Sequence, residues 1–300
     1  CLLIDTGWDT PEAFAALQEQ LEEIGIKFND ITQILITHIH VDHFGLAGKL
    51  RRLSGADVAM HRKDAELVDA RYINMDGLLE QVWHWLESSG VPRDELPQFQ
   101  EASMWMSKFV RPELPEKLLD DGDTISAGPF NLKVVWTPGH SPGHICLYEP
   151  ERKILFSGDH ILPLITPHIG IHPQSGANPL AAYLKSLTKV QGLDIDLALP
   201  GHGPVIREVQ QRIEELLHHH EERAEAIAEV ITGRCETAYH IASQITWMES
   251  QGGVAGRDLD SFNRRLALME TMSHLELLEG EGRVEKVLRD GTVFYSALKS

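Results

Sequence analysis

The sequence predicts an α/β protein with a helical insertion and a mostly helical C-terminal segment. Three observations support this prediction. Short apolar runs alternate with helical patterns over roughly the first two hundred residues. An aromatic-rich stretch, 72–117, interrupts that rhythm, and the pattern after Pro204 becomes largely helical. We therefore expect one domain over residues 1–206, with the insertion at 72–117, and a second domain over residues 207–300.

The first elements can be assigned from local signals. Leu2–Ile4 reads as a strand, and Thr10 is expected to cap a helix that has Pro11 at its first position and ends at Gly25. A strand is expected to end at Ile36. Later elements follow the same logic: a helix at 46–54, strands at 58–60, 131–136, 144–149 and 153–157, a helix after Asn178, and a last strand before Gly201.

Composition limits the possible partners. The net charge of −18 disfavours binding to polyanions, and the three cysteines are too few and too scattered for a disulfide framework or a redox motif. No apolar run has the length of a membrane span. These features predict a cytoplasmic protein that acts on a small molecule, with a homodimer as a possible assembly.

The stretch Thr37-His38-Ile39-His40-Val41-Asp42-His43 carries the strongest chemical signal. It follows the apolar run that ends at Ile36, so a strand is expected to deliver it to one edge of the fold. His38 and His40 are two residues apart and point to the same side of an extended backbone. Imidazole and carboxylate groups are preferred ligands of zinc and related cations. A metal site explains this cluster better than a polar loop does.

Three more candidates follow later apolar runs. His140 lies in Thr137-Pro138-Gly139-His140, Asp159 in Ser157-Gly158-Asp159-His160, and His202 in Pro200-Gly201-His202-Gly203. Together with His38, His40, Asp42 and His43, this ordered set resembles that of the metallo-β-lactamase-fold hydrolases. The resemblance covers about two hundred residues, and it implies an αββα sandwich.

The same resemblance implies the role of each residue. His38, His40 and His140 would bind one metal ion, and Asp42, His43 and His202 a second. Asp159 would bridge them, so Asp42 and Asp159 are the expected catalytic carboxylates. A bridging Asp resembles glyoxalase II, lactonases, thioesterases and nucleases more than dedicated β-lactamases. Two Zn²⁺ ions are expected, with iron or manganese as alternatives. In this family other strands precede the one at Leu2–Ile4, so a front segment, with any targeting signal, is expected to lie outside the sequence.

Substrate contacts are predicted from two segments. The insertion 72–117 holds Trp83, Trp85 and Trp105, half of the chain's tryptophans. Its aromatic side chains either pack inward as a small helical subdomain or, as a cap over the metals, line an apolar substrate pocket; both can hold. The proline-rich loop after Asp159 brings His168 and His172 near the site. Trp105, His168 and His172 are the candidate substrate residues.

Other polar clusters are interpreted as structural. The acidic run Asp120-Asp121-Gly122-Asp123 lacks the calcium-loop pattern and is expected to be a solvated hairpin turn. His61 is expected to be a structural histidine, and Asp5 to support the metal ligands rather than join them. The run His218-His219-His220 lies in a long helical pattern, 205–232, where consecutive side chains splay apart. It is expected to form a solvated face.

The C-terminal pattern is helix, helix, helix, hairpin, which resembles a winged helix-turn-helix found on some lactamase-like hydrolases, including endoribonucleases. From Asp258 to Ser300 there are six basic and eight acidic residues. Because phosphate contacts dominate nucleic-acid affinity, this balance favours a packing or dimerising role, with Phe262 or Tyr295 near the site.

Three functions are compatible with these motifs. The leading prediction is a dinuclear hydrolase in which a metal-bridging hydroxide attacks a small ester, thioester or lactone. A metal-dependent phosphodiesterase or ribonuclease is the alternative, since dinuclear chemistry suits phosphoryl centres equally. A metal-stabilised regulator that binds DNA is the third, and the acidity of the C-terminal segment speaks against it.

Overall fold

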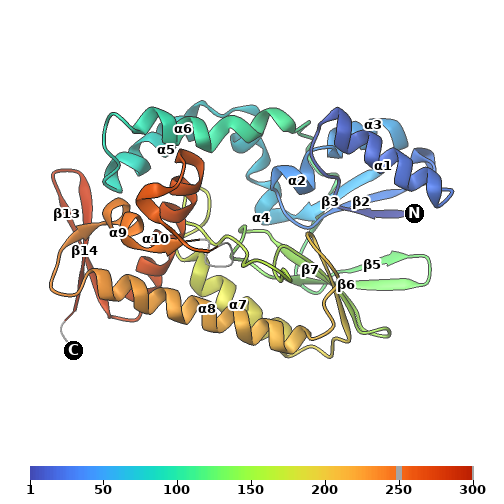
Figure 1. Ribbon diagram of the computed structural model, residues 1–300. Helices are drawn as coiled ribbons and strands as arrows, with labels where there is room; N and C mark the ends of the chain where they lie inside the picture. Colours follow the sequence, from blue (N-terminus) through green and yellow to red (C-terminus); the bar gives the residue numbers. More distant parts are fainter. Residues whose placement is uncertain (248–251, 299–300) are drawn as a thin grey trace.

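Two β-sheets form the centre of the molecule, and each carries helices on its outer face (Figure 1). The computed structural model describes residues 1–247 and 252–298. The first sheet has the strand order β1-β2-β3-β4, and all its neighbours are parallel. Its strands are β1 (Leu2–Ile4), β2 (Gln33–Ile36), β3 (Asp57–His61) and β4 (Lys117–Leu119). The helical elements between these strands are α1 (Pro11–Glu23), η1 (Phe28–Asp30), α2 (Val41–Phe44), α3 (Ala47–Ser54) and α4 (Arg62–Ala65).

The second sheet has the order β5-β6-β7-β8-β9, antiparallel except for the parallel pair β8–β9. Its strands are β5 (Thr124–Ala127), β6 (Phe130–Trp136), β7 (Ile145–Glu149), β8 (Ile154–Gly158) and β9 (Leu197–Pro200). Helices α7 (Pro179–Gln191) and α8 (Val209–Val230) cover its outer face. The result is the mixed α/β sandwich that the sequence predicted.

The layers follow from the alternation of side chains along each strand. In β2, Ile34 and Ile36 pack toward α1 and α3, whereas Leu35 joins the cluster between the two sheets. In β6, Val134 belongs to that inner cluster and Val135 packs toward α7 and α8. Strands that are apolar on both faces are required in a sheet covered on both sides.

The predicted hairpin at 120–123 is wrong. β4 pairs with β3 of the first sheet and β5 with β6 of the second, so this acidic turn carries the chain from one sheet to the other. Its first two residues are also held in place, because Arg62 donates to both carboxylate oxygens of Asp120 at 2.6 Å and Lys189 lies 2.7 Å from Asp121. The hydrogen-bonding partner of an edge strand is decided by tertiary contacts, which a local turn signal does not contain.

The insertion 72–117, called the cap segment below, is helical. It begins within the π-helical turn η2 (Asp69–Ile73) and contains α5 (Asp76–Ser88), α6 (Leu96–Met104) and the 3₁₀ helix η3 (Trp105–Phe109). The C-terminal elements are β10 (Glu236–Thr237), α9 (Ala238–Gln244), β11 (Thr246–Trp247), β12 (Val254–Ala255), η5 (Gly256–Asp258), α10 (Ser261–Gly280), β13 (Val284–Arg289) and β14 (Thr292–Ala297).

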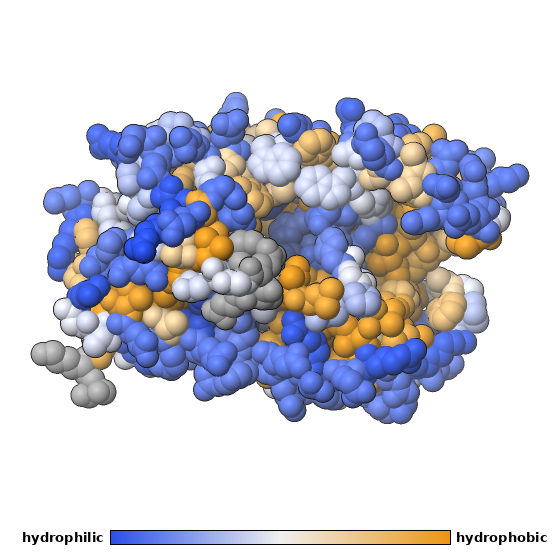
Figure 2. Space-filling view, in the orientation of Figure 1, coloured by the Kyte–Doolittle hydropathy of each residue, from blue (hydrophilic) through white to orange (hydrophobic). Residues whose placement is uncertain are grey.

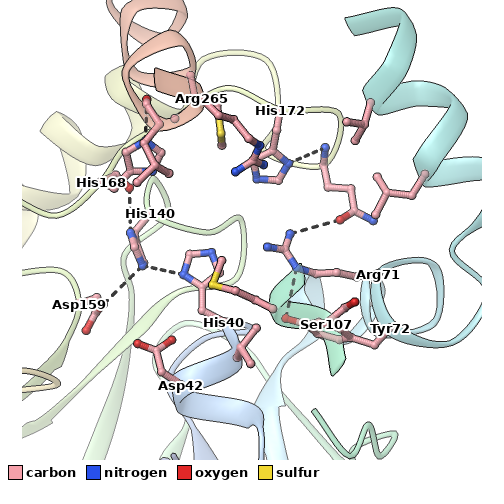
Figure 3. Close-up of a pocket in the computed structure, with 18 of the residues that line it drawn as sticks. His40, Asp42, Arg71, Tyr72, Ser107, His140, Asp159, His168, His172 and Arg265 are labelled. Carbon is pink, nitrogen blue, oxygen red and sulfur yellow. Dashed lines mark hydrogen bonds and ion pairs between the residues drawn. The ribbon is translucent and has the colours of Figure 1, made fainter. Parts of the chain in front are cut away.

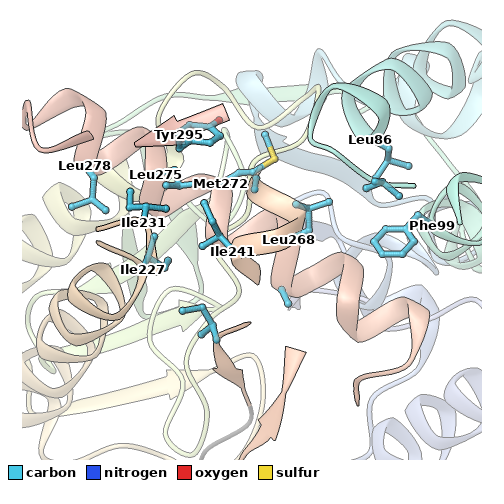
Figure 4. Close-up of a cluster of buried hydrophobic side chains, with 14 of the residues drawn as sticks. Leu86, Phe99, Ile227, Ile231, Ile241, Leu268, Met272, Leu275, Leu278 and Tyr295 are labelled. Carbon is cyan, nitrogen blue, oxygen red and sulfur yellow. The ribbon is translucent and has the colours of Figure 1, made fainter. Parts of the chain in front are cut away.

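The cap segment and the C-terminal segment share one hydrophobic core (Figure 4). Leu86 and Phe99 from the cap meet Ile227 of α8, Ile241 of α9 and Leu268 of α10. Trp83 and Trp85 pack against the same cluster. Three cap aromatics therefore pack inward, Phe99 fully buried and Trp83 and Trp85 in part, as one of the two interpretations held. The predicted domain boundaries remain predictions, but this core ties the two segments together.

The three consecutive histidines of the long helix α8 differ in exposure. His220 is 1% exposed, and its Nδ1 lies 3.2 Å from Nε2 of His274, so the prediction of a solvated face is wrong for this residue. His218, with 65% of its side chain exposed, does face solvent.

Among the described residues, the helices lack an apolar stretch long enough to cross a bilayer.

Candidate metal centre and adjoining pocket

The loop that follows β2 and the short helix α2 hold four of the predicted metal ligands. The strand ends at Ile36, and α2 begins at Val41 with His40 as its N-cap. The ring centroids of His38 and His40 are 4.7 Å apart, and those of His38 and His43 are 4.0 Å apart. The change from strand to helix thus turns these side chains toward one point.

The second sheet supplies the remaining three. His140 follows β6, and its Nε2 lies 2.8 Å from His40 Nδ1. Asp159 follows β8, and its oxygens lie 3.4 Å from His43 Nε2 and 3.6 Å from His140 Nε2. His202 follows β9, with its Nε2 3.1 Å from Asp42 Oδ2. The structure therefore brings all seven predicted residues together.

Three overlapping groups can each hold a cation. The groups are His38, His40 and His140; His38, His43 and Asp159; and Asp42, His43 and His202, and within each group the ligand atoms lie within 4.8 Å of one another. Asp159 stands between the first and the last group, because it contacts His140 on one side and both His43 and His202 on the other.

The donor set fits a metal ion. His38 Nε2 and Asp159 Oδ1 are buried and have no hydrogen-bond partner in the described part of the chain. Buried polar atoms rarely remain unpaired, since the lost hydration costs about 1–3 kcal/mol. Gly201 supports the same geometry, because a Cβ there would lie 2.4 Å from Asp159 Oδ1. A cation among these atoms would satisfy both of the unpaired groups.

The electrostatics differ between the two halves of the cluster. Burial lowers the pKa of His38, His40 and His140, and neighbouring imidazoles add to the effect at His38 and His40. The neutral form, which binds cations, is thereby favoured. The Asp159 and Asp42 carboxylates instead raise the pKa of His202 to about 9.

The carboxylate of Asp159 is held in its ionised form. Burial by itself would raise the pKa of Asp159, but the imidazoles of His202 and His43, 3.5 Å and 3.4 Å from its oxygens, outweigh burial and keep this pKa well below its usual range. An ionised carboxylate at this place is the form that a cation requires.

A layer of buried groups orients the candidate ligands. His43 Nδ1 lies 2.8 Å from Asp5 Oδ2, and His140 Nδ1 donates to the carbonyl oxygen of His168 at 2.9 Å. Asp64 is buried and accepts from Ile39 N at 2.8 Å, Ser141 Oγ at 2.6 Å and Gly143 N at 2.6 Å. It therefore ties the His38–His43 loop to the His140 loop. Partners of this kind fix ring orientation in metal sites.

A cavity of about 270 Å³ opens beside the cluster. Figure 2 shows a hollow at the centre of this face, with hydrophobic residues gathered around it. In Figure 3, His40, Asp42, His140 and Asp159 lie on one side of the pocket, while Arg71, His172 and Arg265 lie across from them. The apolar wall comes from Trp8, Val41, Leu78, Val82, Met106, Leu266 and Met269.

The predicted substrate residues have different positions. His168 and His172 line the pocket, but His168 Nε2 is occupied by the carbonyl oxygen of Leu266 at 3.1 Å. Trp105 is not among the lining residues. It stacks on Trp8, with the ring centroids 6.3 Å apart, and Trp8 lines the pocket instead. Neither Phe262 nor Tyr295 lines the pocket: Phe262 packs against Trp105, and Tyr295 is buried in the C-terminal core.

Sequence reasoning missed several residues of this site. Asp64, Arg71 and Gln174 belong to no recognisable motif, and Arg265 lies in an acidic segment that was read as packing. Their only signal is position: Arg71 directly precedes the cap segment, and Arg265 lies on the third C-terminal helix. His61, by contrast, stacks on Trp136 away from the cluster, with the rings 5.3 Å apart.

Comparison with known proteins agrees with this geometry. The family model described as the metallo-beta-lactamase superfamily matches residues 1–202. The probable metallo-hydrolase YqjP of Bacillus subtilis is 28% identical over 301 residues, which cover 99% of this chain and 90% of that protein. An atrochrysone carboxyl ACP thioesterase of Aspergillus fumigatus is 31% identical over 135 residues, which cover 44% of this chain and 40% of that protein.

Two solved structures resemble the entire chain. A metallo-beta-lactamase family protein from Thermus thermophilus has a TM-score of 0.82 and 30% identity, covering 98% of this chain and 89% of that one. A beta-lactamase domain protein from Burkholderia ambifaria has a TM-score of 0.81 and 26% identity, covering 99% of this chain and 83% of that one. Both matches include the cap and C-terminal segments.

Proposed function

The chain belongs to the metallo-beta-lactamase superfamily, and we propose that it is a dinuclear metal-dependent hydrolase of a small ester, thioester or lactone. The observation that carries the proposal is the position of Asp159, which contacts two potential ligand groups beside a small cavity that has one apolar wall. The thioesterase named among the relatives supports the acyl class.

We assign one cation to His38, His40 and His140, and a second to Asp42, His43 and His202. Asp159 would be shared by both ions, and Zn²⁺ is the proposed metal, with iron or manganese as alternatives. A pair of such ions supplies Lewis acidity and lowers the pKa of water, which is the chemistry that hydrolysis needs. The imidazoles anchored by Asp5 and by the His168 carbonyl are held in the orientation that this role requires.

The protein's own groups then select and hold the substrate. Trp8, Leu78, Met106 and Met269 would contact the acyl part and exclude bulk water from the reacting carbonyl. Asp42 and Asp159 face the same cavity from the metal side. We propose these two carboxylates as the catalytic residues, because both touch the space where the scissile bond would lie.

The test combines metal content with activity. We expect two zinc ions per chain in the wild type and about one in His202→Ala, measured by elemental analysis after zinc loading and dialysis. His218→Ala is the matched control, because that side chain is exposed on α8. A wild-type chain that binds two ions but hydrolyses no ester, thioester or lactone in a broad panel would contradict the acyl assignment.

A phosphodiester and a single-stranded RNA belong in the same panel. Hydrolysis of either one, abolished by Asp159→Ala, would favour the alternative function.

We further propose that the C-terminal segment is a winged-helix-like module used for packing. The element order α8, β10, α9, β11, β12, η5, α10, β13, β14 and the sheet order β10-β14-β13 support this description. Its third helix, α10, is buried along much of its length, including Leu268, Thr271 and Leu275. A helix so enclosed is poorly placed to enter a nucleic-acid groove. Failure of the chain to retard DNA at low salt is the expected result.

A further inference from the structure

Two arginines that belong to no motif line the cavity together. Arg71 lies in the π-helical turn η2 before the cap segment, and Arg265 lies near the start of α10. Short π-helical segments are often found at functional sites. Figure 3 shows both side chains across the pocket from His40, Asp42 and Asp159. Two separate parts of the fold thus deliver positive charge to the side of the cavity that faces the metal cluster.

The partners of Arg71 are neutral. Its Nε donates to the Tyr72 hydroxyl at 3.3 Å and its Nη1 to Gln174 Oε1 at 3.3 Å. These bonds orient the guanidinium, and neither partner carries a negative charge. Within residues 1–247 and 252–298, the structure gives Arg71 no carboxylate at ion-pair distance.

In the part of the chain that the structure describes, the Arg265 side chain makes no hydrogen bond or ion pair. Its Nε is buried and without a hydrogen bond in the described residues, and its pKa falls to about 10 through burial and through repulsion by Arg71. The group stays charged at neutral pH. A buried guanidinium nitrogen without a hydrogen-bond partner is costly, and a second guanidinium nearby adds repulsion. The acids that line this cavity, Asp42 and Asp159, belong to the metal cluster.

His172 and Gln174 complete this end of the cavity. Burial, and then the charges of Arg71 and Arg265, lower the pKa of His172 well below its usual value, so the imidazole is neutral. His172 Nδ1 accepts from the backbone N of Gln174 at 3.1 Å, which fixes its ring. The lining is therefore two fixed cations with neutral polar neighbours. Such an arrangement is typical of an oxyanion-binding site.

We infer that Arg71 and Arg265 bind a carboxylate or phosphate group at the non-reacting end of the substrate, so that the enzyme prefers anionic acyl compounds to neutral ones. The inference rests on the proposed function for the identity of the reaction, but the anion site itself does not depend on catalysis. A cavity of about 270 Å³ limits the substrate to a short chain between its two ends.

Binding of three unreactive acids to the zinc-loaded full chain tests the inference. Pentanoate, glutarate and 4-phosphonobutyrate share one carboxylate, which the metal side can accept, and differ at the far end. Isothermal titration of the wild type should show glutarate or 4-phosphonobutyrate binding roughly 10- to 100-fold more tightly than pentanoate, as expected for charge-assisted hydrogen bonds. The better of the two identifies carboxylate or phosphate as the natural group.

The same titration in variants locates the site. Arg71→Gln and Arg265→Gln should each remove most of the advantage of the dianion, whereas Arg257→Gln, an exposed residue beside Asp258, should keep it. Equal binding of pentanoate and both dianions by the wild type would overturn the inference, and this comparison needs no variant. Survival of the advantage in both folded variants would overturn it too. Because these titrations measure binding and not turnover, they test the anion site even if the hydrolase proposal fails.

Discussion

Replacement of Asp64 by Asn probes how the metal centre is held. The Asp64 carboxylate accepts from Ile39 N, from Ser141 Oγ and from Gly143 N, and so joins the loops that carry His38, His40 and His140. Asn has one acceptor oxygen in place of two. In either orientation its amide would face the N–H of Ile39 or that of Gly143, and that donor would be left unpaired in the interior.

The structure sets the size of the effect. One unpaired buried donor costs about 1–3 kcal/mol, so Asp64→Asn should lower the free energy of unfolding by about that amount. Loss of such a support should also weaken zinc binding by about 10- to 100-fold. Urea unfolding and competition with a chromophoric chelator measure the two quantities on one preparation.

A matched variant separates this effect from loss of charge alone. Asp57→Asn removes an exposed ion pair with Lys117, whose Nζ lies 3.0 Å from the carboxylate, and should cost less than about 1 kcal/mol with zinc affinity unchanged. If Asp64→Asn unfolds and binds zinc as the wild type does, the reasoning that this carboxylate positions the ligand loops is refuted.

Two further predictions use other features of the structure. Gly201→Ala would place a Cβ 2.4 Å from Asp159 Oδ1 and should reduce the zinc content, measured by elemental analysis. Gly77→Ala, where a Cβ meets nothing within 4 Å, should leave the zinc content unchanged. Equal zinc contents in the two variants would contradict this prediction. Burial lowers the pKa of His274 to about 3, so its contribution to stability is complete above about pH 6.5 and is lost as the pH falls toward 3. The free energy of unfolding should therefore fall less between pH 7 and pH 5 in His274→Gln than in the wild type, by about 1–2 kcal/mol. The control His218→Gln, at an exposed site, should show the wild-type fall. An equal fall in His274→Gln and the wild type would contradict the prediction.

The sequence predicted those parts of the molecule that follow from local order. The ends of the first helix were indicated by the cap Thr10 and by Gly25, and the apolar run that ends at Ile36 indicated a strand. The His38–His43 motif could be recognised because its residues are close in the chain. The convergence of His140 and Asp159 could be expected because each follows a strand.

The remaining features depend on contacts between distant segments. Asp64 is a single residue whose partners lie 25 to 79 positions away in the chain, and nothing near it marks that role. The acidic turn at 120–123 looked like a hairpin because its local residues suit one, but the strand partners lie in different sheets. His220 was read as exposed because the helical pattern cannot show that α10 covers it.

The net charge is also a property of the whole sequence and does not show where the charges lie, although their placement bears on the substrate. A net charge of −18 disfavours a long polyanion, because such a partner must lie along an extended surface. It does not disfavour a small anion, because exposed charges more than about 8–10 Å away are largely screened at physiological salt. The charges that a small anion would meet directly are those that line the cavity, where Arg71 and Arg265 lie opposite the proposed metal ligands. An acidic protein with a cationic pocket can therefore reject nucleic acids and still select a small anionic substrate.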